Sequence, residues 1–208
     1  ELEGPKVLKT LVADIGGTNS RLAIAITSRQ DKEITLKNIH KFRNSDFNNF
    51  DEVIKRYLSI SDERSISRMC IAAAGIISDT TVEMSNLNWK ITVPSLQKTA
   101  KIDEVFIIND LQAQGYALDF IEPNDLEELI EGSYSKGPND TKLVCGMGTG
   151  FNVAIAYQTA FGTFVPASEY GHARTTTANE KQKMILKKLE ENSSFVSYEN
   201  ILAGPGLN

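Results

Sequence analysis

The sequence predicts a mixed α/β fold in two domains that begin alike. Short strand patterns alternate with amphipathic helix patterns along the 208 residues. Each half opens with a strand, a glycine-rich turn and two more strands, first from residue 7 and again from residue 142. Between the halves, from Leu111, the pattern turns helical. We therefore expect a boundary near residues 110–120, with one domain over residues 1–110 and a second over residues 111–208.

In the N-terminal half, strand patterns stand on both sides of one helix pattern. Strands are predicted at 7–14, 20–27, 33–42, 69–77 and 105–109. The run 69–77 is continuously apolar, which is typical of a single buried strand. The helix pattern rests on apolar residues at helical spacing, namely Phe50, Val53, Ile54, Tyr57 and Leu58.

The C-terminal half begins with a helical pattern over 111–121 and a polar connection over 123–138, in which a short helix is predicted at 124–131. Strands are predicted at 142–145, 151–157 and 163–167. Thr177 to Glu180 reads as a capping box that starts a helix, whose apolar face is Met184, Ile185 and Leu189.

Composition excludes several classes of function. A net charge of −5 argues against a nucleic-acid or anionic-membrane surface. No run approaches the length of a membrane span and no signal-peptide pattern is present, so we expect a cytoplasmic protein. Cys70 and Cys145 each lie in an apolar run, which predicts core packing rather than a disulfide or a zinc site.

The turn between the first two strands is the most informative feature. It contains Asp14, Gly16, Gly17, Thr18 and Asn19. Glycines leave no Cβ in the way, so backbone N–H groups can approach an anion such as phosphate. Thr18 and Asn19 add side-chain donors, and Asp14 is suited to hold a hydrated Mg²⁺. The alternative is a plain hairpin whose glycines serve only turn geometry.

Asn109 and Asp110 end an apolar strand pattern and begin a helical one. A carboxylate at the end of a strand is well placed to act as a general base. Since Asp and Asn also cap helices well, a simple N-cap is the alternative.

Three further segments carry polar side chains suited to a sugar. Asn86 lies close to the only tryptophan, Trp89, and amides beside an aromatic ring suit a ligand rich in hydroxyls. A turn that packs its tryptophan is the alternative. Glu169 and His172 share one short segment, and Glu199 precedes Gly204-Pro205-Gly206. Each of these could also be a solvated surface group.

Taken together and in order, these motifs resemble the bacterial-type glucokinase family. Six segments carry the resemblance over nearly the whole chain: Asp-x-Gly-Gly-Thr-Asn, Asn-x-x-Trp, Asn-Asp, Gly-Thr-Gly, Glu-x-Gly-His, and Glu before Gly-Pro-Gly. The resemblance implies the actin-like ATPase (ribonuclease-H-like) fold with two domains and mixed sheets, the first domain small and the second large. It also implies ATP-dependent phosphorylation of glucose or another hexose, with ATP and Mg²⁺, in a protein that is a homodimer at full length.

The resemblance also implies a role for each matched residue. It makes Asp110 the catalytic base and assigns sugar binding to Asn86, Asn109, Asp110, Glu169, His172 and Glu199. The first phosphate loop would comprise Asp14, Gly16, Gly17, Thr18 and Asn19, and the second Gly148, Thr149 and Gly150. Asp14 would hold Mg²⁺ through water.

Two departures from the family pattern qualify these expectations. Arg174 stands where the family has an aspartate after Gly-His, so a positive charge replaces a negative one beside the expected sugar site. The family also continues for about a third of its length after the segment that ends here at Asn208. We expect these 208 residues alone to bind ATP weakly and to turn over poorly.

Two other functions remain open on sequence grounds. One is a sugar-binding or regulatory relative without catalysis. The other is an ATPase of this fold that takes no sugar. It is disfavoured because four polar residues would together have no purpose in it, namely Asn109, Glu169, His172 and Glu199. A coupled assay of ADP release with several hexoses distinguishes all three.

Overall fold

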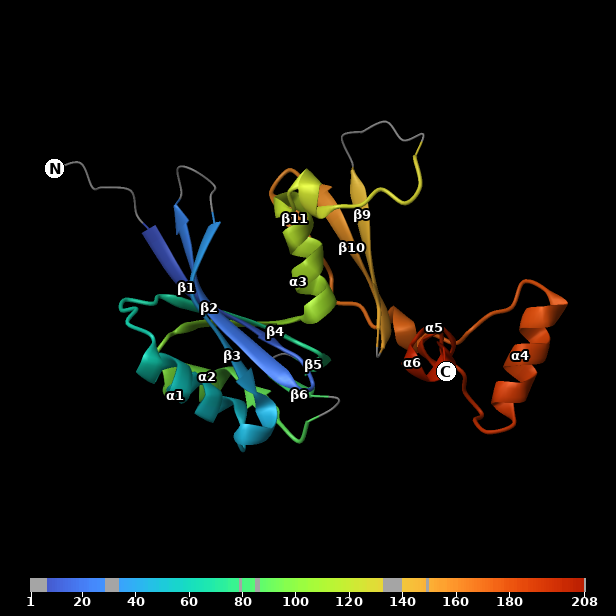
Figure 1. Cartoon of the computed structure of the whole chain (residues 1–208), viewed down its shortest axis with the longest axis horizontal. Helices are drawn as coiled ribbons and strands as arrows, with labels where there is room; N and C mark the ends of the chain where they lie inside the picture. The colour runs from blue at the N-terminus through green and yellow to red at the C-terminus, as the bar shows by residue number, and fades with distance from the viewer. Residues whose placement is uncertain are drawn as a thin grey trace. The chain divides into compact units, whose positions relative to one another are not determined.

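The structure, a computed structural model, describes residues 7–28, 34–78, 80–84, 87–132, 140–148 and 150–207. The chain divides into two compact units, Glu1–Asp110 and Leu111–Asn208, which we call unit 1 and unit 2. Both units contain β-strands together with helices (Figure 1), so the predicted α/β class with mixed sheets is confirmed.

A five-stranded mixed sheet in the order β3-β2-β1-β4-β8 forms the frame of unit 1. Its strands are β1 (Val7–Ile15), β2 (Asn19–Ser28), β3 (Ile34–Arg43), β4 (Arg68–Ala73) and β8 (Glu104–Asn109). β1, β2 and β3 form an antiparallel meander, whereas β1, β4 and β8 run parallel. The strands predicted at 7–14, 20–27, 33–42 and 105–109 are confirmed to within one residue at each end.

Two helices cover one face of this sheet (Figure 1), namely α1 (Phe50–Ile60) and α2 (Val93–Ala100). α1 begins after Asn49, whose side-chain oxygen accepts the Glu52 N–H at 3.0 Å. Its predicted apolar face is buried in the core of unit 1, with Tyr57 fully enclosed. The 3-10 helix η1 (Asn44–Asp46) joins β3 to α1.

The apolar run at 69–77 is not one strand, so that prediction is wrong. It splits into β4 and β5 (Gly75–Ser78), and β5 belongs to a separate three-stranded sheet with β6 (Thr81–Met84) and β7 (Lys90–Thr92). A Cβ on Gly75 would lie 2.4 Å from the Glu83 carbonyl oxygen, so glycine lets β6 approach this closely. The chain can therefore change sheets immediately after β4.

Unit 2 contains a second antiparallel meander, made of β9 (Thr141–Met147), β10 (Phe151–Thr159) and β11 (Gly162–Phe164). The repeated order of strand, glycine turn and two strands is therefore confirmed. α3 (Asp110–Ala117) starts at the last residue of unit 1 and packs within unit 2, where Gln112 Nε2 donates to the Val165 oxygen at 2.6 Å. The remaining short helices are η2 (Leu118–Phe120), η3 (Pro123–Asp125), η4 (Tyr170–His172), α4 (Glu180–Glu190), α5 (Glu199–Leu202) and α6 (Gly204–Leu207).

Several expectations for this half need correction. The helix predicted at 124–131 is wrong, because only η3 forms there, and Leu129 and Ile130 remain 84% and 86% exposed instead of packing as the apolar face of a helix. The strand predicted at 163–167 ends at Phe164. The helix predicted over 111–121 ends at Ala117 and is followed by η2.

The cysteine and capping predictions also change. Cys145 is exposed on the alternating strand β9, so its predicted core packing is wrong, while Cys70 is half-buried. Burial raises the pKa of the Cys70 thiol.

α4 begins where expected, but its cap is Asn179, which accepts the Gln182 N–H at 2.9 Å. Two residues of its predicted apolar face are exposed, Met184 at 73% and Ile185 at 47%, while Leu189 is half-buried. No helix in the described ranges is long and apolar enough to cross a membrane.

Asp119 links the end of α3 to the sheet of unit 2. It accepts hydrogen bonds from Lys142 Nζ at 2.5 Å, Gln158 Nε2 at 2.8 Å and Thr163 Oγ1 at 2.6 Å. Donation from Lys142, then from the other two groups, lowers the pKa of Asp119 from 3.8 to about 2. This carboxylate thus fastens η2 to all three strands of the meander.

Because the folded state lowers the pKa of Asp119, its ionised form favours folding above pH 3.8, and that contribution is lost as the pH falls toward about 2. We expect Asp119→Asn to destabilise unit 2 by about 1 kcal/mol near neutral pH, allowing for partial exposure, and by less near pH 2. Hydrogen exchange of β9 and β10 amides at several pH values measures this. Glu128→Gln, on an exposed carboxylate, is the control, and an equal effect of Asp119→Asn at every pH would contradict the account.

Candidate active site

The first glycine turn joins β1 to β2 at one end of the sheet in unit 1. Gly16 N–H donates to the Asn19 carbonyl at 3.0 Å, which closes the turn. Asp14 lies on the exposed side of β1, where Arg21 Nη1 stands 3.3 Å from its carboxylate. Surface ion pairs of this kind contribute little to folding stability, and the Asp14 side chain remains 57% exposed. Its carboxylate is therefore accessible to a hydrated cation.

The conformations of Gly16 and of Gly148, in the second predicted phosphate loop, bear on whether these are phosphate loops or plain hairpins. Neither Gly16 nor Gly148 has a φ in the left-handed region, so the backbone does not require glycine at these two positions. A Cβ on Gly16 would make only an ordinary 3.5 Å contact, and a Cβ on Gly148 would meet no described atom within 4 Å. The space that a side chain would fill is open, which fits the approach of a ligand to the backbone.

Asn109 and Asp110 lie at the same edge of the sheet as this turn. The register of the parallel strands aligns Ile15, Ala73 and Asn109 in one row. Since neighbouring strands are about 4.8 Å apart, the ends of β1 and β8 are separated by roughly 10 Å. Asn109 is buried, and Asp110 is the first residue of α3, where the helix dipole favours an ionised carboxylate.

The second glycine turn lies between β9 and β10 and contacts Glu199. Gly148 N–H donates to the Gly150 carbonyl at 2.9 Å. A Cβ on Gly150 would lie 2.7 Å from Glu199 Oε2, so glycine there makes room for this carboxylate. Thr149, also predicted in this turn, lies outside the described residues.

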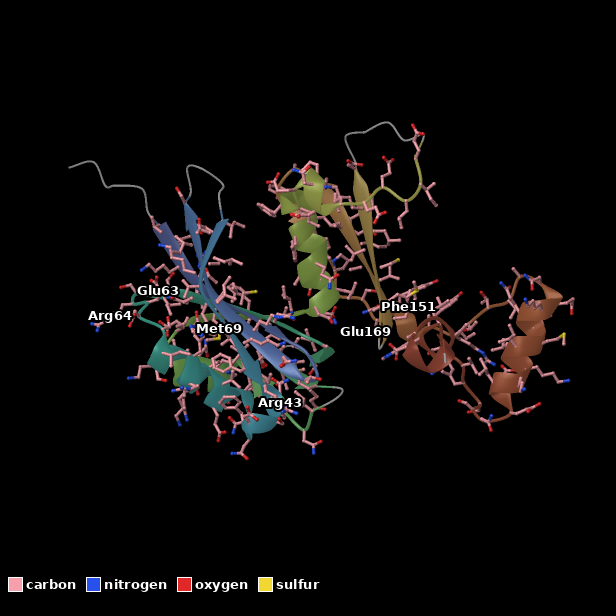
Figure 2. All side chains as sticks on the ribbon, in the orientation of Figure 1. Arg43, Glu63, Arg64, Met69, Phe151 and Glu169 are labelled. Atoms are coloured by element: carbon pink, nitrogen blue, oxygen red, sulfur yellow. The ribbon has the colours of Figure 1, made fainter. Side chains whose placement is uncertain are left out.

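Glu199 connects this turn to the predicted sugar ligands of unit 2. Its Oε2 accepts the Phe151 N–H at 3.0 Å, and its Oε1 is 3.7 Å from His172 Nε2. Glu169 is near as well, because Asn152 Nδ2 donates to the Ser168 carbonyl at 2.6 Å and lies 3.5 Å from Glu169 Oε2. Figure 2 shows Phe151 and Glu169 in the same part of unit 2. The structure thus brings Glu169, His172 and Glu199 together around the start of β10.

Two predicted features of the sugar site have other surroundings. Asn86 lies outside the described residues, while Trp89 is 7% exposed and its ring stands 6.3 Å from that of Phe50. Arg174 extends to Glu190 of α4, with Nη2 3.1 Å from Oε1. Its charge is therefore balanced by a carboxylate outside the three proposed ligands.

Two residues in these sites were not singled out from the sequence. Asn44 contacts the first glycine turn through its side chain, which donates to the Gly16 carbonyl at 2.8 Å. Gly171 packs so closely that a Cβ would lie 1.7 Å from the Phe151 carbonyl oxygen, so glycine seats η4 against β10. The glycine between Glu169 and His172 was a visible signal for the second, whereas Asn44 had no motif to mark it.

No three His, Cys, Asp or Glu side chains in the described part of the chain gather as a ready-made metal site. Mg²⁺ in phosphoryl-transfer sites is held by one or two carboxylates together with water and phosphate oxygens. The exposed carboxylate of Asp14 beside an open glycine turn fits that pattern.

Comparison with known proteins identifies the family. Residues 11–208 match the glucokinase family. A glucokinase of Saccharophagus degradans is 28% identical over 95% of this chain, and the chain spans 60% of that relative's length.

Solved structures show the same fold. A glucokinase from an Antarctic psychrotroph has a TM-score of 0.80 and 30% identity over 96% of this chain, which covers 62% of it. A glucokinase from Balamuthia mandrillaris, solved in complex with glucose, has a TM-score of 0.68 and 22% identity over 100% of this chain, again 62% of that protein. The actin-like ATPase fold expected from the motifs is confirmed, and the chain belongs to the glucokinase family.

Proposed function

We propose that the full-length protein transfers the terminal phosphate of ATP to glucose and forms glucose 6-phosphate. The observation that most supports this is that the first glycine turn and Asp110 follow the carboxyl ends of β1 and β8, which both run parallel to β4. The last residues of these two strands, Ile15 and Asn109, align with the same residue of β4. Ligands of α/β proteins commonly bind at the carboxyl ends of parallel strands. A carboxylate and an open backbone turn at that edge are the groups that phosphoryl transfer needs.

Asp110 acts in this proposal as the general base. It removes the proton of the sugar 6-hydroxyl as the oxygen attacks the terminal phosphorus and ADP leaves. Its position as the first residue of α3 favours the ionised form that a base requires. Asn109 binds the sugar from the adjacent position.

The two glycine turns bind the phosphates of ATP. Backbone N–H groups of residues 16–19 and 148–150 donate to phosphate oxygens, with help from the side chains of Thr18 and Asn19. Asp14 holds Mg²⁺ through water, and the bound ion supplies positive charge to the phosphates.

Glu169, His172 and Glu199 bind the sugar hydroxyls. Their clustering around the start of β10 supports this assignment, because adjacent hydroxyls of one pyranose need several polar groups in a fixed arrangement. A cytoplasmic location and a homodimer remain predictions.

The functional test is a coupled assay of ADP release by the full-length protein with glucose, mannose and galactose. We expect glucose to have the lowest KM, because a site that hydrogen-bonds each hydroxyl rejects an epimer that leaves one buried group unpaired. Similar KM values for all three would leave a hexose kinase without glucose as its specific substrate. Binding of glucose without ADP release would favour a non-catalytic relative.

The second glycine turn offers a clean test of nucleotide binding. Gly148→Val is expected to weaken MgATP binding about tenfold or more, because its side chain fills the space left open above the turn. The protein should fold, since a Cβ there meets no described atom within 4 Å. Calorimetry with MgATP and with glucose measures both affinities, and Gly148→Ala should have a smaller effect. Unchanged MgATP affinity in a folded Gly148→Val protein would refute this assignment.

A further inference from the structure

A buried asparagine lies beneath the first glycine turn. Asn44, 1% exposed, makes three hydrogen bonds to residues in or next to this turn. Its Nδ2 donates to the Gly16 carbonyl at 2.8 Å, and its backbone N–H donates to the Thr18 carbonyl at 2.9 Å. Its Oδ1 accepts from the hydroxyl of Ser20, a residue with no exposed surface, at 2.7 Å. Two carbonyls of the turn are thereby held by one residue.

The chemistry of asparagine suits this position. Its side chain donates and accepts at the same time, which a carboxylate or an aliphatic group of the same size cannot do. A buried polar side chain is unfavourable unless its hydrogen bonds are made, so the contacts with Gly16 and Ser20 are strongly preferred over looser arrangements. The Asn44 side chain therefore holds the Gly16 carbonyl, and its backbone N–H holds the Thr18 carbonyl, which fixes the shape of the turn.

Arg43, the residue before Asn44, carries a positive charge, which no side chain of the first glycine turn provides. Arg43 is exposed at the end of β3, and Figure 2 shows it at the end of unit 1 away from Glu63 and Arg64. Its Cα partner is Asn19, the last residue of the turn, so the two side chains share one face of the sheet. Arg21 on the same face is paired with Asp14, whereas Arg43 makes no ion pair with any described residue.

We propose that Arg43 and Asn44 are a further part of the nucleotide-phosphate site. Arg43 binds an oxygen of the ATP phosphates directly, and Asn44 is a positioning residue that holds the turn in its binding shape. The proposal rests on the phosphate-binding role proposed for residues 16–19. A guanidinium offers several donors in a planar fork that matches phosphate oxygens, and it stays charged at any working pH.

Arg43 is tested by MgATP calorimetry on the full-length protein. Arg43→Gln should raise the Kd for MgATP about 5- to 10-fold and leave the Kd for glucose unchanged. The control is Lys37→Gln, an equal charge change on the same strand, roughly 20 Å away and beyond the Debye length at 0.1 M salt. Equal Kd values for the Arg43→Gln and Lys37→Gln variants would overturn the role of Arg43.

Asn44 is tested against a variant that weakens the same core elsewhere. Tyr57→Phe removes a partly buried hydrogen bond to the Asn38 carbonyl, 3.0 Å long, and leaves the contacts of the turn in place. Asn44→Ala should speed hydrogen exchange of Gly17 and Thr18 amides and weaken MgATP binding, and Ser20→Ala should do so less. Tyr57→Phe should lower the melting temperature while leaving both quantities unchanged. If Asn44→Ala changes only the melting temperature, Asn44 has no positioning role.

These binding measurements separate the two proposals. MgATP binding that depends on Arg43, in a protein that does not phosphorylate glucose, would reject the proposed function and retain this site. Glucose phosphorylation with no effect of Arg43→Gln on MgATP affinity would do the reverse.

Discussion

Asp110→Asn is expected to lower kcat for glucose phosphorylation by roughly 10²- to 10⁴-fold, the range that a general base contributes. Asparagine keeps the size of the side chain and can still begin α3, but it cannot take the proton of the 6-hydroxyl. The Kd for glucose should change little, because the loss affects the transition state rather than ground-state binding. Steady-state kinetics together with glucose calorimetry measures both.

The matched control for this variant is Asp103→Asn. Asp103 is an exposed carboxylate just before the opposite end of β8, so its replacement changes the same charge far from the proposed site. The kcat of the Asp103→Asn variant should equal that of the unchanged protein. An Asp110→Asn variant that retains kcat would show that another group, or none, removes the proton.

Glu199→Ala is expected to raise the KM for glucose about 10- to 100-fold, since hydrogen bonds to a charged group contribute about 1.5–3 kcal/mol each. It should also weaken MgATP binding, because Glu199 Oε2 accepts the Phe151 N–H at 3.0 Å and so supports the second glycine turn. Glu169→Ala should raise the KM for glucose without this second effect.

Comparison of two variants isolates the charge of Glu199. Glu199→Gln keeps an acceptor for Phe151, so MgATP affinity should largely return while the KM for glucose stays raised. Glu190→Ala, which removes only the surface partner of Arg174, should leave both unchanged. A glucose KM for Glu199→Ala within twofold of the unchanged protein would remove Glu199 from the sugar site.

Much of the fold was predictable because its signals are local. The alternation at the end of β1 and the apolar spacing in α1 each reflect burial of one face, a signal that neighbouring residues carry. The start of α3 at Asp110 was equally visible, since an apolar strand pattern ends at Asn109. The ordered polar motifs then pointed to the family.

The features that the sequence did not predict depend on distant contacts. Gly75 breaks the run at 69–77 because of an approach by Glu83, and nothing in the run itself signals that neighbour. Cys145 is exposed because one face of β9 is uncovered in this structure, although its own pattern suits a buried strand. α2 was overlooked, although Thr92, whose hydroxyl accepts the Ser95 N–H, and Pro94 mark its start.

The candidate site shows the same limit. Motifs identified Glu199 and Gly150, but only the structure shows that Glu199 Oε2 occupies the space beside Gly150. Asn44 contacts Gly16 from 28 positions along the chain, so no local pattern could connect them.

The most direct test of the account is phosphorus NMR of the full-length protein with glucose and MgATP. We predict that one new phosphomonoester appears, that it is glucose 6-phosphate, and that it forms in step with ADP. Phosphate at another hydroxyl would contradict the role of Asp110 as base for the 6-hydroxyl. Release of inorganic phosphate, or no product while glucose and MgATP are both bound, would contradict the proposed phosphoryl transfer itself.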